Sequence, residues 1–134
     1  MSPEVKIRKI ALLLKYIDDL SKHKTISFEN YLKNHYEIER LLELLVETAS
    51  DLTMHILTIK DDSVPTNYRS SFLRLGEIKL IPKKLSENLA KFAGMRNILV
   101  HGYEKVDDKI IHNSIKQAIV DFSKFVEEIK DIRL

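Results

Sequence analysis

The residue types best suited to chemistry lie in one short segment, from Gly94 to Tyr103. On a helical wheel, four polar side chains of this segment fall on one arc: Arg96, Asn97, His101 and Tyr103. Asn97 and His101 are four residues apart and are therefore neighbours on a helix surface. The other side of the wheel is predicted to pack inward, and it carries Met95, Ile98, Leu99 and Gly102.

These four side chains suit the handling of a phosphodiester. An arginine fork matches phosphate oxygens and can stabilise developing negative charge. A histidine can take a proton from a ribose hydroxyl or give one to a leaving oxygen. Asn97 can orient either side chain, and Tyr103 can stack on a base, donate to a phosphate or act as a nucleophile. The spacing alone also allows a plain surface helix with solvated Arg96 and His101.

Composition limits the kind of protein to one small globular domain. The 134 residues carry no cysteine, a net charge of +2 and only three glycines and three prolines, so we expect a single domain over residues 1–134. Residues 68–134 hold thirteen basic and nine acidic side chains, which makes this half the better candidate for phosphate binding. No apolar run is long enough to span a bilayer and no signal peptide is apparent, so we expect a cytoplasmic protein that does not associate with a membrane.

The hydrophobic pattern predicts helices and no strands. Apolar residues spaced three and four apart predict helices over residues 3–22, 28–60, 67–76, 82–93 and 108–129. Gly94 is predicted to bend or interrupt the fourth helix, with a further helical piece over residues 95–103. The expected fold is an all-α antiparallel bundle of four to five helices, with one or two short extra helices between the long ones.

The segment from Arg96 to Tyr103 resembles the Arg-x4-His-x-Tyr signature of HEPN-domain toxins of the HepT type. Further stretches resemble the same family, and they cover most of the chain: Glu39–Leu42, Asp51–Ile56, Val64–Phe72, Leu80–Leu85 and Gly94–Asn97. The resemblance implies a HEPN-like helical bundle that forms a homodimer, in which two Arg/His sets face one cleft.

The resemblance also implies a function. It implies a metal-independent endoribonuclease acting on RNA, with Arg96 and His101 as the active pair and Asn97 in support. It implies as partner an MNT-type nucleotidyltransferase antitoxin that transfers AMP from ATP to Tyr103 and silences the nuclease. The chain has no recognisable ATP-binding motif and no predicted cofactor, so the ATP site is expected on the antitoxin.

Two alternatives remain open. The same cleft could belong to a non-catalytic subunit that binds a nucleotide or assists a minimal nucleotidyltransferase, with Tyr103 as a substrate only. The chain could also be a structural helical dimer without chemistry. Asp51 and His55, four residues apart on the long helix, lack a third metal ligand and are expected to orient His101 or contact phosphate.

Overall fold

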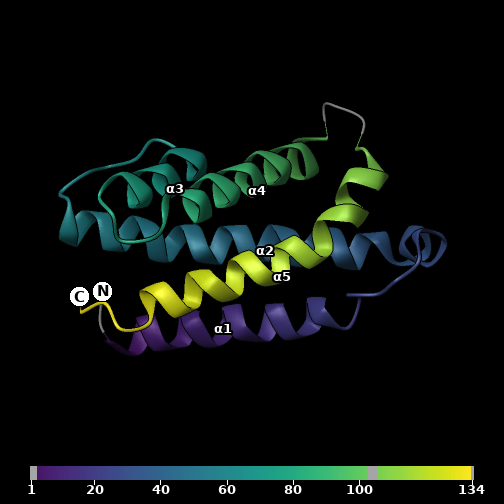
Figure 1. The fold of residues 1–134 in the computed structure, drawn as a ribbon, viewed down its shortest axis with the longest axis horizontal. Helices are drawn as coiled ribbons and strands as arrows, with labels where there is room; N and C mark the ends of the chain where they lie inside the picture. The colour runs from purple at the N-terminus through teal and green to yellow at the C-terminus, as the bar shows by residue number, and fades with distance from the viewer. Residues whose placement is uncertain (1–2, 103–105, 134) are drawn as a thin grey trace.

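A computed structural model describes residues 3–102 and 106–133 of the chain. It contains five helices within these ranges: α1 (Pro3–Ser21), α2 (Phe28–Lys60), α3 (Tyr68–Glu77), α4 (Lys83–His101) and α5 (Asp108–Ile129). In Figure 1, α1 and α4 run in one direction along the molecule while α2 and α5 run in the other. The predicted all-α antiparallel bundle is confirmed, and α3 is its one short helix in the described part of the chain.

Helix α2 is the spine of the bundle. It spans 33 residues and packs against each of the other four helices. Its buried side supplies much of the core, including Tyr31, Leu45, Ala49 and Leu52, all with no exposed surface. Burial of this apolar face, at about 25 cal/mol per Å², is the main force that holds the other helices against α2.

Side-chain caps fix where three helices begin. The Ser27 side chain accepts a hydrogen bond from the backbone amide of Asn30 (3.1 Å) at the start of α2. Asn67 caps α3 in the same way through the Ser70 amide (2.8 Å). Asp107 accepts from two amides of the first turn of α5. Each cap satisfies amides that have no partner inside the helix.

The predicted interruption at Gly94 is wrong. Helix α4 continues through Gly94 to His101 and ends at Gly102, which has a left-handed backbone (φ 64°) and donates its N–H to the Ile98 carbonyl (3.1 Å). A glycine inside a helix lowers stability modestly without requiring a bend, whereas a glycine at the C-cap is the usual terminator. The helical position predicted for Tyr103 lies outside the described residues.

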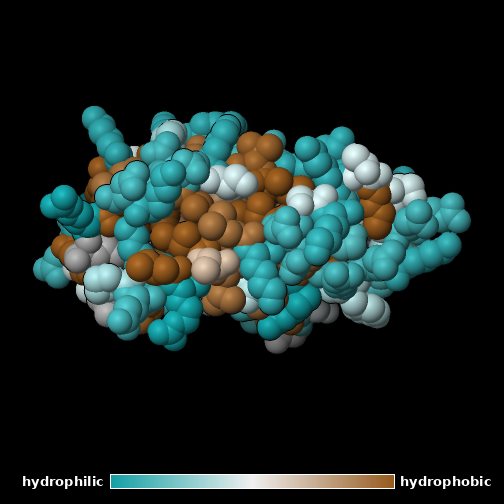
Figure 2. Space-filling model, turned by 90° about the horizontal axis from the view of Figure 1, so that it is seen from below, coloured by the Kyte–Doolittle hydropathy of each residue, from teal (hydrophilic) through white to brown (hydrophobic). Residues whose placement is uncertain are grey.

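The outer surface of the bundle carries an apolar area on the side where α1 lies. Figure 2, which views this side, shows apolar side chains gathered near the middle of the face. Helix α1 contributes Ile7 and Leu14 to the exposed hydrophobic residues. Within the described ranges, no helix is both long and apolar enough to cross a bilayer.

Candidate functional site

Arg96 lies on the side of α4 that faces α2 and the first residue of α3. Its Nη2 donates to Oε1 of Glu47 on α2 (3.0 Å), and its guanidinium carbon lies 5.0 Å from the centroid of the Tyr68 ring. The side chain of Arg96 is 18% exposed and that of Glu47 is 29% exposed, so the ion pair is partly shielded from solvent. Three helices therefore fix one guanidinium.

The other N–H groups of Arg96 are less engaged. Nη1 makes a long contact with Oδ1 of Asn97 (3.5 Å), and Nε is buried without a hydrogen-bond partner in the described part of the protein. A guanidinium has five donors, of which the Glu47 bond uses one and the long Asn97 contact a second. With Nε buried, the donor capacity that remains for a further anion lies on Nη1 and Nη2, each of which has a second N–H.

His101 is the last residue of α4, and its side chain is exposed. Asn97, one helical turn before it, is exposed as well. The polar arc predicted for Arg96, Asn97 and His101 therefore exists on one continuous helix, with the arginine partly buried at one end and the histidine accessible at the other. Tyr103, the predicted modification site, lies outside the described residues.

The predicted inward face of this segment is only partly correct. Met95 and Leu99 pack against the core, as expected. Ile98, however, is 40% exposed, and Gly102 is also exposed. Ile98 is exposed because it lines an open groove between α4 and α5, and Gly102 because it is the C-cap at the end of the helix.

Asp51 and His55 lie on α2, one and two turns after Glu47. The Asp51 carboxylate accepts from Nζ of Lys9 on α1 (3.3 Å). His55 is exposed. Glu47 and Asp51 are four residues apart and so lie on one side of α2, with Arg96 at the first carboxylate and Lys9 at the second.

Sequence reasoning missed Glu47 and Tyr68. Glu47 precedes Asp51 by one helical turn, so the stripe that contains Asp51 and His55 could have suggested it. The only sequence signal for Tyr68 was its place in the family-like segment Val64–Phe72. Among the described residues, no three His, Asp or Glu side chains lie close enough to hold a metal ion.

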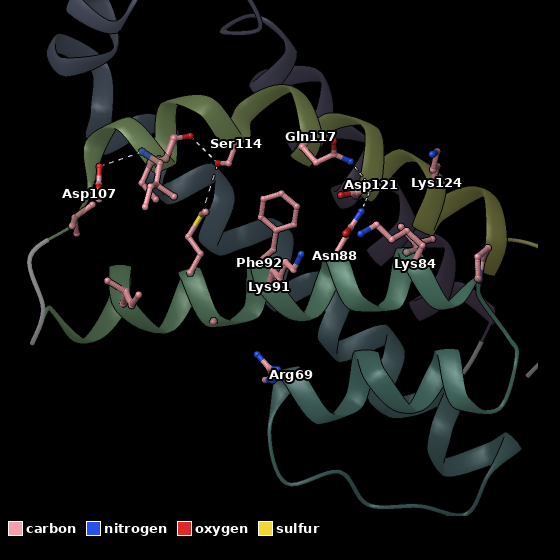
Figure 3. Close-up of a pocket in the computed structure, with 18 of the residues that line it drawn as sticks. Arg69, Lys84, Asn88, Lys91, Phe92, Asp107, Ser114, Gln117, Asp121 and Lys124 are labelled. Carbon is pink, nitrogen blue, oxygen red and sulfur yellow. Dashed lines mark hydrogen bonds between the residues drawn. The ribbon is translucent and has the colours of Figure 1, made fainter.

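A separate groove runs between α4 and α5, with a volume of about 1150 Å³. Its floor is mostly apolar and includes Leu85, Phe92 and Met95. Figure 3 shows Asn88 and Gln117 reaching toward Asp121, whose Oδ1 accepts from both amides (3.4 and 3.0 Å). Arg96 and His101 do not line this groove. The groove therefore lies at a different place on α4 from the predicted catalytic residues Arg96 and His101.

The fold and the arginine–histidine helix define a HEPN-type helical domain. The sequence matches the family described as ribonuclease HepT-like over residues 13–129. The chain belongs to this HepT-like family, as the resemblance predicted.

Curated relatives and solved structures agree with this assignment. The chain is 30% identical over 133 residues to a protein named tRNA nuclease HepT from Aphanizomenon flos-aquae, covering 96% of this chain and 90% of the relative. It is 34% identical over 89 residues to one named mRNA nuclease HepT from Shewanella oneidensis, covering 66% of this chain and 67% of the relative. A tri-AMPylated Shewanella oneidensis HEPN toxin, solved in complex with an MNT antitoxin, superposes with a TM-score of 0.87 at 28% identity and covers 98% of this chain and 100% of that toxin.

Proposed function

We propose that the protein is the toxin of a HEPN/MNT toxin–antitoxin pair and a metal-independent endoribonuclease. The observation that carries the proposal is the geometry of Arg96, which is oriented by Glu47 and Tyr68 and retains N–H groups on Nη1 and Nη2, on the helix that ends in an exposed His101. The names of the nuclease relatives support the same conclusion.

The proposed reaction is an internal transesterification of RNA. The 2′-hydroxyl attacks the adjacent phosphorus while His101 takes its proton, the bond from phosphorus to the 5′-oxygen breaks, and that oxygen takes a proton from water as it leaves; His101 returns its own proton to solvent afterwards. The products are a 2′,3′-cyclic phosphate and a 5′-hydroxyl. Arg96 stabilises the charge that develops on the phosphate oxygens, and Asn97 supports the pair. DNA lacks the 2′-hydroxyl and should not be cleaved.

A homodimer would bring two such sets to one cleft. Exposed apolar residues support this pairing: Ile98 and Val100 lie between Asn97 and His101 on α4 and are 40% and 43% exposed. Ile110, near the start of α5, is 58% exposed. A surface that combines apolar side chains with an arginine is typical of a protein interface.

The test of the nuclease compares the purified protein with Arg96→Ala and His101→Ala on RNA, with EDTA present. We expect cleavage by the wild type, a cyclic phosphate product, and losses of at least about 100-fold in both variants. His23→Ala is the matched histidine control and should cleave normally, because His23 lies in the connection between α1 and α2. Equal cleavage by wild type and His101→Ala would remove the assignment. A folded wild-type dimer without cleavage would favour the non-catalytic, nucleotide-binding or partner subunit.

We assign Tyr103 as the residue to which the MNT antitoxin transfers AMP, releasing pyrophosphate from ATP bound by the antitoxin. The family-like position of Tyr103 two residues after His101 supports this, as does the AMPylated state of the Shewanella oneidensis toxin. Mass spectrometry after incubation with antitoxin and ATP should locate adenylyl groups on the peptide that contains Tyr103. Modification that persists unchanged in Tyr103→Phe would contradict the assignment.

A further inference from the structure

We infer that Glu47 is a positioning residue that holds the Arg96 guanidinium against the ring of Tyr68, in the orientation in which it meets the RNA phosphate. The inference rests on the proposed nuclease function for its kinetic consequence. Its structural part concerns only the side chain of Arg96.

The platform under Glu47 is rigid. Glu47 lies near the middle of α2, and its neighbours Leu45, Val46 and Ala49 are almost completely buried. The Glu47 side chain is itself only 29% exposed, so it has fewer rotamers open to it than a fully exposed glutamate. An ion pair built on it therefore costs less side-chain entropy than a pair between two flexible surface side chains.

The arginine is restrained from two directions. The Glu47 carboxylate fixes Nη2 at 3.0 Å, and the Tyr68 ring lies under the guanidinium at 5.0 Å. A hydrogen bond to a carboxylate sets the position of one nitrogen in the guanidinium plane, whereas a ring contact restricts the tilt of that plane. Together they leave the guanidinium few orientations, which is the condition for presenting Nη1 to an anion in a fixed direction.

A second arginine lies near the Glu47 carboxylate. Arg40 lies on the same side of α2, where the hydrogen bond that it donates to Glu43, followed by the charge of Glu47, raises the pKa of the Arg40 guanidinium. Glu47 thus interacts with arginines of two helices. Within residues 3–102 and 106–133, Arg96 is the one arginine that donates to it directly, because the Arg40 hydrogen bond goes to Glu43 (3.0 Å).

Removing Glu47 should therefore lower kcat more than it changes KM. Glu47→Ala leaves the positive charge of Arg96 in place, so RNA still binds, but the guanidinium loses its fixed direction. Misplacement of a catalytic group by about 1 Å can cost about 100-fold in rate, so we expect a fall in kcat of roughly 10- to 100-fold with KM within about 3-fold. Glu47→Gln keeps a carbonyl acceptor without the charge and should recover most of the lost rate.

Glu43→Ala is the matched control. Glu43 sits one turn before Glu47 on α2 and pairs with an arginine at the same distance (3.0 Å), but that arginine is Arg40. Its removal should leave kcat unchanged. Tyr68 offers a second pair of variants: Tyr68→Phe keeps the ring and should be active, whereas Tyr68→Leu should resemble Glu47→Ala.

The experiment measures kcat, KM, the pH–rate profile and thermal stability for each variant, together with NMR of the arginine side-chain N–H groups. We expect the Nη–H signals of Arg96 to be separately resolved in the wild type and Glu43→Ala and to merge through faster rotation in Glu47→Ala. The NMR result does not need nuclease activity. An inactive wild type with this spectral change would therefore reject the proposed function and still support the positioning of Arg96.

Three results would overturn the inference. Unchanged kcat in Glu47→Ala would show that Arg96 needs no such support. Equal losses in Glu47→Ala and Glu43→Ala, with equally lowered thermal stability, would mean that both carboxylates act only on the fold. Loss of the acidic limb of the pH–rate profile in Glu47→Gln would assign Glu47 to proton transfer rather than positioning.

Discussion

Replacement of Gly76 by alanine tests how closely α3 packs on α4. A Cβ added at Gly76 would lie 2.7 Å from Cβ of Ser86 on α4 and would also meet the Ser86 hydroxyl oxygen. That hydroxyl could rotate away only by giving up its hydrogen bond to the Lys83 carbonyl (2.8 Å), and the contact between the two Cβ atoms would remain. The two helix backbones must therefore separate.

The expected cost follows from two opposing terms. Overpacking of a close contact costs about 1–3 kcal/mol, whereas alanine gains at most about 1 kcal/mol over glycine from helix propensity. The gain is smaller here because α3 ends one residue later, at Glu77. We expect a net loss of about 1–2 kcal/mol, which lowers Tm by roughly 3–8 °C for a chain of this size.

A second substitution makes the reasoning refutable. Ser86→Gly removes the obstructing atoms. The double variant Gly76→Ala/Ser86→Gly should therefore lose less free energy of unfolding than the two single variants lose together, by about 1 kcal/mol or more. Urea unfolding followed by circular dichroism supplies the four free energies of unfolding. Additivity within about 0.5 kcal/mol, or a Gly76→Ala variant more stable than the wild type, would show that the close approach does not limit packing.

Three further predictions concern charges and caps. The Arg74 guanidinium lowers the pKa of Asp61 through two hydrogen bonds (2.7 and 3.0 Å), so the pair stabilises the fold above the ordinary Asp pKa of about 3.9. The stability difference between wild type and Arg74→Ala should therefore shrink in urea titrations as the pH falls below about 4. Asp107→Ala should lower the free energy of unfolding by about 0.5–2 kcal/mol through loss of the α5 cap, whereas an unchanged midpoint would contradict that role. Burial, followed by the charges of Glu39 and Asp108, raises the pKa of the Tyr31 hydroxyl, so Tyr31→Phe should leave the amplitude of the tyrosinate absorbance step near pH ~10 unchanged.

The helices could be predicted from the sequence because their signals are local. Ser27, Asn67 and Asp107 are capping residues directly before apolar stripes, and the structure uses each of them as a cap. Which glycine ends α4, Gly94 or Gly102, cannot be told from the neighbouring sequence alone. It depends on whether α4 keeps neighbours beyond Gly94, and only the packed bundle decides that.

Some residues of the candidate site can likewise be predicted from the sequence, and others cannot. Arg96 and His101 share one helix, so their spacing and family-like context point to them directly. Glu47 is 49 residues away from Arg96 in the chain, and no periodicity relates a residue of α2 to one of α4. The sequence therefore predicts which groups carry chemistry, whereas the contacts that orient them require the helices to be placed in space.

Helix α2 links the two sides of the proposed site. Among the described residues α1 and α4 do not pack against each other, yet both reach α2, through Lys9 to Asp51 and through Arg96 to Glu47. The two carboxylates are one helical turn apart, about 6 Å along the axis. A rotation of α2 within the bundle would therefore move both ion pairs together. Because α2 is also the helix that packs against all the others, the packing that fixes the position of α2 also fixes the position of Glu47, which orients Arg96.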